Sequence, residues 1–566
     1  MRFLIAAALF VVALFSLLFG VAERTVWAPP AAYTETLKVN TTSALVLIPN
    51  EVLSKHPGTP SVVATGAKNS FLASGRESDI LAWIGNTGYA TVTFDEQGKK
   101  LQQTIAMGAD SLDNPAGSDL WRSEFSGKES GSLKIALAED GAALVASNGI
   151  LPAPNQLTLI WPIAHDLFWS NIALLVGGVL LLAAFVMNYL AYRHMRKSRG
   201  PRRRTPTAPK PPKYKVKRNK ANAPVRGRRS ARRAFIALPI ALSILTTSTG
   251  CVTSSAPVES PSPSISAIEL PPVALVEAQV TKILASVEQV TTDADLTSDK
   301  KVLADRFAGP ALEQRSAHYV LRSRSTSVAA LPKIVGKPVS FSLPAATDSW
   351  PRTLMVVTDE AGDAALPQML VMQQATPRSK YLLWYNIRLM PGAKIPEVPS
   401  AETGAIPVEN DSLFLKLAPA DIASGYGDVI NKGAASLSFG LFETENDEFY
   451  KQVSQSQKSQ VANLTTGKIT FSHALGNKNV ISLATSTAGA LVAVYMTDTY
   501  KIKPKKAGSA VAVSGQEKLM LGADGSTRGV RSIYGDMMLF YVPALSDTDR
   551  IRLLGVSQGL ISVRSL

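Results

Sequence analysis

The sequence predicts a multi-domain membrane protein: a β-rich exported domain between two transmembrane helices, then a third apolar segment and two tandem α+β cone-like domains, each with helices followed by a curled antiparallel sheet. Long uncharged apolar runs stand beside a strongly basic stretch, and helical patterns precede strand patterns twice in the C-terminal half. The composition agrees, since 46% of the 566 residues are hydrophobic and only 18% are charged. An ordinary soluble protein has roughly 25% charged residues.

Residues 1–22 are predicted to form the first transmembrane helix. The eighteen residues 4–21 carry no charge. As a helix they would span about 27 Å, close to the ~30 Å hydrocarbon core of a bilayer. A secretory signal peptide is the alternative interpretation. The next residues, AERTVW, include bulky and charged side chains and no clear A-x-A cleavage site, which favours an uncleaved anchor.

Residues 23–166 are predicted to form an exported β-rich domain, a sandwich or open barrel, because short apolar runs alternate there with turn residues. The eight runs are 44–48, 61–64, 70–73, 80–84, 89–94, 132–138, 143–147 and 157–161. The segment NPAGSDLW, residues 114–121, places Asp119 and Trp121 in a loop. This loop either contacts a ligand or partner, or it lets the tryptophan pack on a small β core, which the size of the indole ring favours.

Residues 167–192 are predicted to form the second transmembrane helix. Its uncharged run has aromatic residues at both ends, as in helices with interfacial belts. The basic stretch that follows places this end in the cytoplasm by the positive-inside rule. We therefore expect a multi-pass plasma-membrane protein whose N-terminus and residues 193–233 are cytoplasmic, with residues 23–166 and 251–566 outside.

Residues 193–233 hold eighteen Lys or Arg and no acid, so the net charge of +15 becomes 15 − 18 = −3 without them. Charge confined to one short segment argues against a nucleic-acid-binding face. The segment is rich in Pro and is predicted to be disordered. It either lies on anionic lipid head groups or only determines topology. The head-group-binding candidates are Arg202, Arg203, Arg204, Lys213, Lys215, Lys217, Arg218, Arg228 and Arg229.

Residues 234–250 form a third apolar run, and the only cysteine of the chain, Cys251, follows it. A basic region, an apolar region, small residues and then cysteine resemble a bacterial lipoprotein signal, with Cys251 as the lipidation candidate. Ser248 departs from that pattern, which prefers Leu three residues before the cysteine. An uncleaved third spanning helix is the alternative. Residues 251–267 read as a Ser/Pro linker.

Residues 268–405 are predicted to form the first α+β domain. A helix begins near residue 276, a second covers 298–307, and a third follows Gly309–Pro310. The apolar stripe of the first helix is Val276, Val280, Ile283, Leu284, Val287 and Val290. Four strands are expected at 338–344, 353–359, 368–374 and 380–390.

Residues 406–566 repeat this order. Ile422, Tyr426, Val429 and Ile430 mark one face of a helix that begins near Pro419. A second helix is expected at 446–463, and strands at 468–473, 480–485, 490–500, 537–543 and 550–563. The order of elements resembles the nuclear-transport-factor-two-like fold, twice in tandem.

The whole layout resembles an uncharacterised family of actinobacterial membrane and envelope proteins. The segments that carry the resemblance are ERTVW (23–27), NPAGSDLW (114–121), RRAFIALP (232–239), WPRT (350–353) and RIRLLG (550–555). The resemblance implies topology and lineage but no activity, although some relatives are labelled automatically as glycosyltransferases.

The sequence offers no catalytic constellation and no metal or cofactor site. A glycosyltransferase commonly holds a divalent ion with D-x-D through hard oxygen ligands. The chain has this pattern at 293–295 and 547–549, where cap and turn roles are expected. His318 and His473 have no Ser, Cys or acidic partner at a recognisable spacing, so both are expected to be structural. A single cysteine excludes intramolecular disulfides.

Four aromatic residues, Trp384, Tyr385, Tyr495 and Phe540, either line an apolar pocket or fill the core. The resulting hypothesis is a membrane-anchored envelope protein that binds or scaffolds without catalysis. Its expected partners are the lipid bilayer and an envelope protein or cell-wall component. The alternative is an envelope enzyme, such as a glycosyltransferase that uses a lipid-linked donor.

Overall fold

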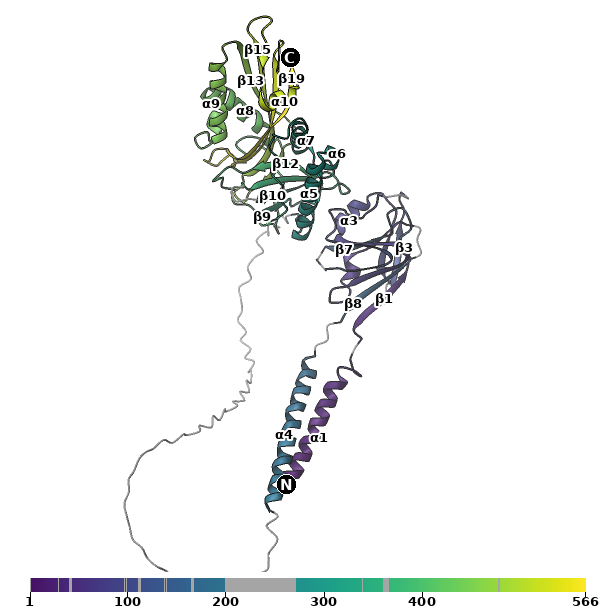
Figure 1. Cartoon of the computed structure of the whole chain (residues 1–566). Helices are drawn as coiled ribbons and strands as arrows, with labels where there is room; N and C mark the ends of the chain where they lie inside the picture. The colour runs from purple at the N-terminus through teal and green to yellow at the C-terminus, as the bar shows by residue number, and fades with distance from the viewer. Residues whose placement is uncertain are drawn as a thin grey trace, which may run out of the picture. The chain divides into compact units, whose positions relative to one another are not determined.

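The computed structural model describes residues 2–28, 30–39, 43–95, 97, 99–109, 113–136, 138, 140–163, 167–198, 271–337, 339–359, 366–476 and 479–566. The chain divides into two compact units (Figure 1). Among the described residues, one unit contains 2–28 and 167–198, and the other contains those of 30–163 and 271–566.

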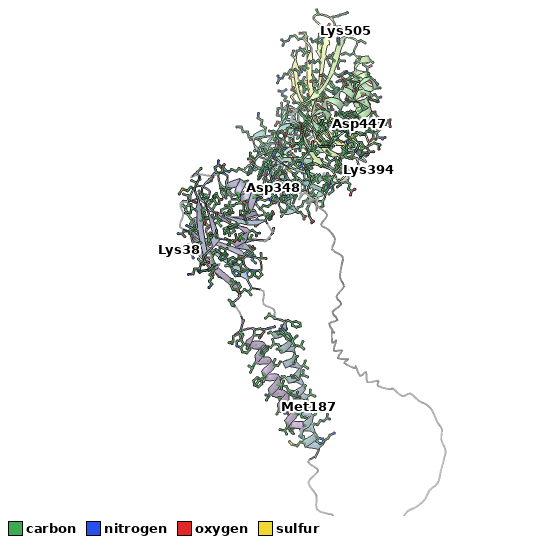
Figure 2. All side chains as sticks on the ribbon, turned by 180° about the vertical axis from the view of Figure 1, so that it is seen from behind. Lys38, Met187, Asp348, Lys394, Asp447 and Lys505 are labelled. Carbon is green, nitrogen blue, oxygen red and sulfur yellow. The ribbon has the colours of Figure 1, made fainter. Side chains whose placement is uncertain are left out.

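The first unit is a pair of helices, α1 (Arg2–Ala22) and α4 (Phe168–Ser198). Both are long and apolar enough to cross a membrane, with mean hydropathies of 2.8 and 2.3. Glycine allows the close packing, since a Cβ atom at Gly177 would lie only 2.8 Å from Leu17 Cγ. The Ser16 hydroxyl donates to the Ala173 carbonyl at 2.7 Å. Figure 2 shows the remaining side chains standing outward around the pair, with Met187 labelled.

The first region of the second unit is an eight-stranded sheet in the order β1-β8-β3-β7-β2-β4-β5, with β6 paired to β3. Neighbouring strands are antiparallel except β2 and β4. The strands are β1 (Ala32–Lys38), β2 (Leu45–Ile48), β3 (Ser61–Arg76), β4 (Tyr89–Phe94), β5 (Leu101–Ala106), β6 (Ser123–Lys134), β7 (Gly141–Ala146) and β8 (Gln156–Pro162), and the helices are α2 (Asn50–Leu53) and α3 (Glu77–Ile84).

Both faces of this sheet are buried around β2. Val46 and Ile48 enter one apolar cluster, whereas Leu45 and Leu47 enter another. Successive side chains of a strand point to opposite faces, so the two clusters lie on the two sides of the sheet.

One predicted strand of this region is wrong, because residues 80–84 belong to helix α3. Ile80, Trp83 and Ile84 are all buried, and their spacing of three and four places them on one helical face. Gly85, with a positive φ of 60°, ends the helix. A five-residue apolar run is ambiguous by itself, and packing of Trp83 against Trp121 favours the helix here. The runs 61–64 and 70–73 are parts of one long strand, β3.

The next region places helices before a four-stranded antiparallel sheet of order β12-β11-β10-β9. Its elements are α5 (Glu277–Thr297), α6 (Lys300–Leu303), α7 (Gly309–Arg324), β9 (Val339–Pro344), β10 (Arg352–Thr358), β11 (Gln368–Gln374) and β12 (Leu382–Arg388). The helix expected at 298–307 is only the single turn α6. Gly309 has a positive φ of 49°, and a Cβ atom there would lie 2.3 Å from the Trp384 ring.

The last region repeats this order, with helices before a sheet in which β13, β15, β18 and β19 are neighbours and β14 pairs with β15. Figure 1 shows α8 and α9 on one side of it. The elements are η1 (Pro419–Asp421), α8 (Ile422–Lys432), η2 (Gly433–Ala435), η3 (Phe439–Leu441), α9 (Glu448–Asn463), β13 (Gly467–Leu475), β14 (Ile481–Ala484), β15 (Ala490–Pro504), β16 (Val511–Ala512), α10 (Gly515–Leu521), β17 (Gly525–Ser526), β18 (Val530–Val542) and β19 (Arg552–Ser565). The elements α10, β16 and β17 were not predicted from the sequence.

These two α+β regions share one hydrophobic core that includes both sheets. Tyr385 of β12 donates its hydroxyl to the Asn479 carbonyl, and Tyr495 of β15 donates to Glu313 of α7 at 2.8 Å. Two of the four aromatic residues considered as pocket liners, Tyr385 and Tyr495, therefore join the two regions, whereas Phe540 lies in a separate core of the last region.

Candidate functional site

The most extensive buried polar contacts in the second unit join its β-rich region to its C-terminal regions. Asp119, from the NPAGSDLW segment, is 1% exposed. Its carboxylate accepts two hydrogen bonds from the Arg306 guanidinium, at 2.6 and 3.0 Å, and a third from the Tyr381 backbone N–H at 2.7 Å. A bidentate arginine–carboxylate pair fixes both distance and orientation, so this contact sets how the two regions meet.

Trp121 anchors the loop that carries Asp119 to the β-rich region. Trp121 is 1% exposed and packs against Trp83 with ring centres 5.5 Å apart. Its indole N–H donates to the Pro115 carbonyl at 2.7 Å. The predicted packing of Trp121 on the β core is confirmed. The neighbouring Asp119 does contact a partner, which is another region of the same chain.

A second buried ionic cluster lies at the same junction. Asp79 of α3 receives hydrogen bonds from Arg76 at 2.9 and 3.0 Å and from Arg352 of β10 at 2.7 Å. Burial alone would raise the pKa of Asp79, but hydrogen bonds from Arg352 and Arg76 outweigh it and hold this pKa below its usual range. The Arg352 guanidinium also stacks 3.8 Å from the centre of the Trp350 ring. The WPRT segment thus supplies an anchor of this junction.

Backbone carbonyls complete the junction. Arg378 donates to the carbonyls of Trp83 and Ile84, both at 2.9 Å. Gln279 of α5 donates to the carbonyls of Asp119 and Leu120 at 3.0 and 2.9 Å. These donors satisfy the carbonyls at the end of α3 and in the NPAGSDLW loop, which would otherwise be costly to bury.

A different polar cluster lies inside the last region. His473 of β13 and Asp498 of β15 are paired in register, and the His473 Nδ1–H contacts the Asp498 carboxylate. On the other side of the ring, the Gln457 amide donates to His473 Nε2 at 2.8 Å. Asp536 of β18 is a diagonal neighbour of Asp498, because β15 pairs Met496 with Asp536. The three strands thus bring one imidazole and two carboxyl groups together.

The electrostatics of this cluster follow from burial. Desolvation lowers the pKa of His473 to about 4, so the imidazole is neutral, and the hydrogen bonds assign its proton to Nδ1. Desolvation raises the pKa of Asp498 to about 7. Burial and then the neighbouring charge of Asp498 raise the pKa of Asp536 well above its usual value. Burial therefore favours the neutral forms of these three side chains. Gln457, not a nucleophile, occupies the free side of the imidazole.

An open groove lies beside this cluster, between α8, the loop that follows it, α9 and β13, with a volume of about 720 Å³. Gly433 ends α8 with a positive φ of 57°. The chain then continues into the loop that forms one side of the groove. Gln457 lines the groove, and its amide nitrogen also contacts His473. The groove and the buried cluster thus share one side chain.

The two D-x-D matches do not form an acidic site. Asp293 accepts hydrogen bonds from Gln289, whereas Asp295 binds Arg315 at 2.9 Å. Asp547 accepts the backbone N–H of Asp549 at 3.1 Å, in the turn before β19. Neither pair lines a described groove, and the described part of the chain contains no group of three or more His, Cys, Asp or Glu side chains placed to hold a metal ion.

Several predicted site residues lie outside the described residues. They are the lipidation candidate Cys251 and the head-group candidates Arg202, Arg203, Arg204, Lys213, Lys215, Lys217, Arg218, Arg228 and Arg229. The third apolar segment, 234–250, lies outside them as well. His473 is buried, which agrees with the structural role expected for it. Its acidic neighbours Asp498 and Asp536 were not predicted. One pattern in the sequence could have indicated them. Asp498 lies two residues after Met496 in an apolar strand, so both side chains point to the same, buried face.

Comparison with known proteins gives a family for the C-terminal half. A domain of unknown function, DUF8094, matches residues 272–565, which is more than half of the 566 residues. No curated protein and no solved structure matches the chain. The matched range starts just before α5 and ends within β19, so it covers both α+β regions. The chain therefore belongs to the DUF8094 family.

Proposed function

We propose that this chain is a multi-pass plasma-membrane protein that presents one extracytoplasmic binding body to the cell envelope. In this proposal, residues 23–166 and 251–566 lie outside, and the N-terminus and residues 193–233 are cytoplasmic. The body binds an envelope protein or a cell-wall component and performs no catalysis. The observation that carries the proposal is the buried junction through Asp119 and Arg306.

The junction constrains how the chain can thread through a membrane. Residues 30–163 and 271–566 share buried ion pairs, so they must lie on the same side. The helix α4 lies between them in the sequence. If α4 crosses the membrane, the chain after it must return before residue 271. The only apolar run between them is 234–250, which supports a third crossing or an export signal at that place.

The orientation follows from charge. Eighteen Lys or Arg and no acid follow α4 within residues 193–233. Cytoplasmic loops carry such an excess of basic residues, whereas translocated loops of this length do not. The body is therefore assigned to the outside. The Lys and Arg residues of this segment are also suited to anionic head groups at the inner surface, with about 1 kcal/mol for each residue near the membrane.

Accessibility labelling with a membrane-impermeant thiol reagent tests the topology. In a Cys251→Ala background, a Lys505→Cys variant should be labelled in intact cells, because Lys505 is exposed on the body. A Lys210→Cys variant should be labelled only after permeabilisation. Labelling of Lys210→Cys in intact cells would overturn the proposed orientation. Crosslinking from Lys505 in intact cells would then identify the binding partner.

The finer architecture is part of the same proposal. We propose nuclear-transport-factor-two-like cones for the two α+β regions, an actinobacterial envelope origin, and lipidation at Cys251. Metabolic labelling with a lipid analogue should give a signal that Cys251→Ala abolishes. An unlabelled full-length band near 60.3 kDa would favour a plain third helix instead.

A further inference from the structure

We propose that the groove between α8, α9 and β13 binds a monoacyl lipid with an anionic head group. The groove is open and has a volume of about 720 Å³. That volume lies within the range of roughly 300–1,000 Å³ typical of ligand sites. The inference concerns this groove alone and stands independently of the topology proposed above.

Apolar side chains form most of the groove surface. Phe439 comes from the loop after α8, Val461 from α9 and Phe471 from β13. Val461 is 57% exposed, and Leu437, on the same loop as Phe439, is fully exposed. Contact between an acyl chain and these side chains would remove apolar surface from water, which is the main source of affinity for such ligands.

The polar groups of the groove are suited to an anion. Lys432 and Lys458 line it, and no acidic side chain does. Lys432 is paired with Asp428 at 2.8 Å, whereas Lys458 has no carboxylate partner among the described residues. The Ser454 hydroxyl, one helical turn before Lys458, is buried and makes no hydrogen bond within the described structure. A carboxylate or phosphate oxygen in the groove would pair with the exposed ammonium group of Lys458.

The helix α9 places these groups in one line. Ser454, Gln457, Lys458 and Val461 follow the spacing of three and four residues that forms one helical face. On this face Gln457 is buried, whereas Lys458 and Val461 are exposed. A free phosphate would leave the apolar surface of the groove unused, and a neutral hydrocarbon would leave Lys458 without a counter-charge. A ligand with one anionic group and one chain matches both features.

Photolabelling of the full chain tests the inference. The protein is placed in phosphatidylcholine nanodiscs with a diazirine-bearing palmitic acid, irradiated, digested and mapped. The label should fall on peptides between residues 430 and 471. Unlabelled palmitate should compete, and inorganic phosphate should not. A diazirine-bearing fatty amine of the same chain length should label these peptides at least fivefold less.

Variants of α9 separate binding from folding. Val461→Asp and Lys458→Gln should each reduce the label at least fivefold, because one places a charge on the apolar wall and the other removes the unpaired cation. Lys451→Gln is the matched control, since Lys451 lies on the same helix, pairs with Glu448 and does not line the groove. Both test positions are exposed, so the unfolding temperature should not change.

Three results would overturn the inference. The first is equal labelling by the acid and the amine, which would show that charge is not recognised. The second is label at residues 430–471 that persists in both Val461→Asp and Lys458→Gln. The third is competition by phosphate as strong as that by palmitate, which would mean an anion site without a place for a chain.

Discussion

Asp79 at the junction and Asp536 inside the last sheet are equally buried, with 2% and 0% exposure, yet their pKa values move in opposite directions. Asp79 lies between two guanidinium groups, so its charge is matched. Asp536 lies beside another carboxyl group and an imidazole whose own pKa is lowered. Burial is common to both sites, and the partner decides which protonation state is stable.

This difference separates two roles for buried charge. At the junction, two guanidinium groups stabilise the charge of Asp79, and the buried ion pairs hold the regions together by geometry. In the inner cluster, burial and the neighbouring carboxyl group favour the protonated form of Asp536. Each of the following variants removes one feature of this comparison, from the largest expected effect to the smallest.

Arg306→Ala should produce the largest loss. It leaves the Asp119 carboxylate buried without its guanidinium, which costs about 3–5 kcal/mol. We expect the junction to weaken by more than a hundredfold. The measurement uses the full chain with a protease site inserted after residue 220. After cleavage, the wild-type parts should elute together from a gel-filtration column, and those of Arg306→Ala should separate.

The paired variant Arg306→Met with Asp119→Leu is the control for this prediction. It removes both charges and fills their space, so it should lose much less than either single change. If the double variant were as weak as Arg306→Ala, shape and not uncompensated charge would explain the loss.

His473→Phe should have the next largest effect. The change removes the donor to Asp498 and the acceptor for Gln457 while it keeps an aromatic ring at the position. Each buried group left without a partner costs about 1–3 kcal/mol. Thermal unfolding at pH 7 should report a lower midpoint. An unchanged midpoint would show that water satisfies both groups.

Local periodicity explains which parts of the fold were predictable. The bounds of β11, 368–374, and the buried face of α8 followed from patterns within a few residues. The short run 80–84 failed because five apolar residues fit a strand or a helix equally. Tertiary packing of Trp83 against Trp121 resolves that ambiguity.

The sites were less predictable because they depend on contacts between distant residues. Asp119 and Arg306 are separated by 187 positions, and nothing in either local pattern indicates the other. His473, Asp498 and Asp536 meet only through the register of three strands. NPAGSDLW and WPRT were noted in the sequence only as segments that carry a family resemblance, and the structure places both at the junction.

Asp536→Asn should change the pH dependence of stability. A carboxyl whose pKa is raised on folding contributes stability at low pH, and this is lost as the pH rises through the folded pKa. His473 opposes this trend only below about pH 6.5, where the unfolded imidazole gains a proton. Above about pH 7, wild-type stability should therefore fall by up to about 1.4 kcal/mol per pH unit through Asp536.

Chemical unfolding of the full chain between pH 7 and pH 8.5 measures this slope. Asp536→Asn should have a shallower slope than the wild type, because the amide does not titrate and only Asp498 still releases a proton in this range. Asp524→Asn is the matched control, since Asp524 is exposed and pairs with Lys518 outside the cluster. Equal slopes in Asp536→Asn and the wild type would mean that Asp536 is ionised in the folded protein.

Lys282→Gln should have the smallest effect, although it also breaks an ion pair at the junction. Lys282 contacts Glu124 at 2.8 Å, but 38% of its side chain and 25% of that of Glu124 remain exposed. Water solvates both groups when the pair is broken, so the loss should be about 0–1 kcal/mol. It should disappear in 0.5 M salt, because exposed charges are screened, whereas the loss in Arg306→Ala should persist. The same cleavage and gel-filtration assay compares the two variants. A loss in Lys282→Gln as large as that in Arg306→Ala would mean that the number of ion pairs, and not their burial, determines the strength of the junction.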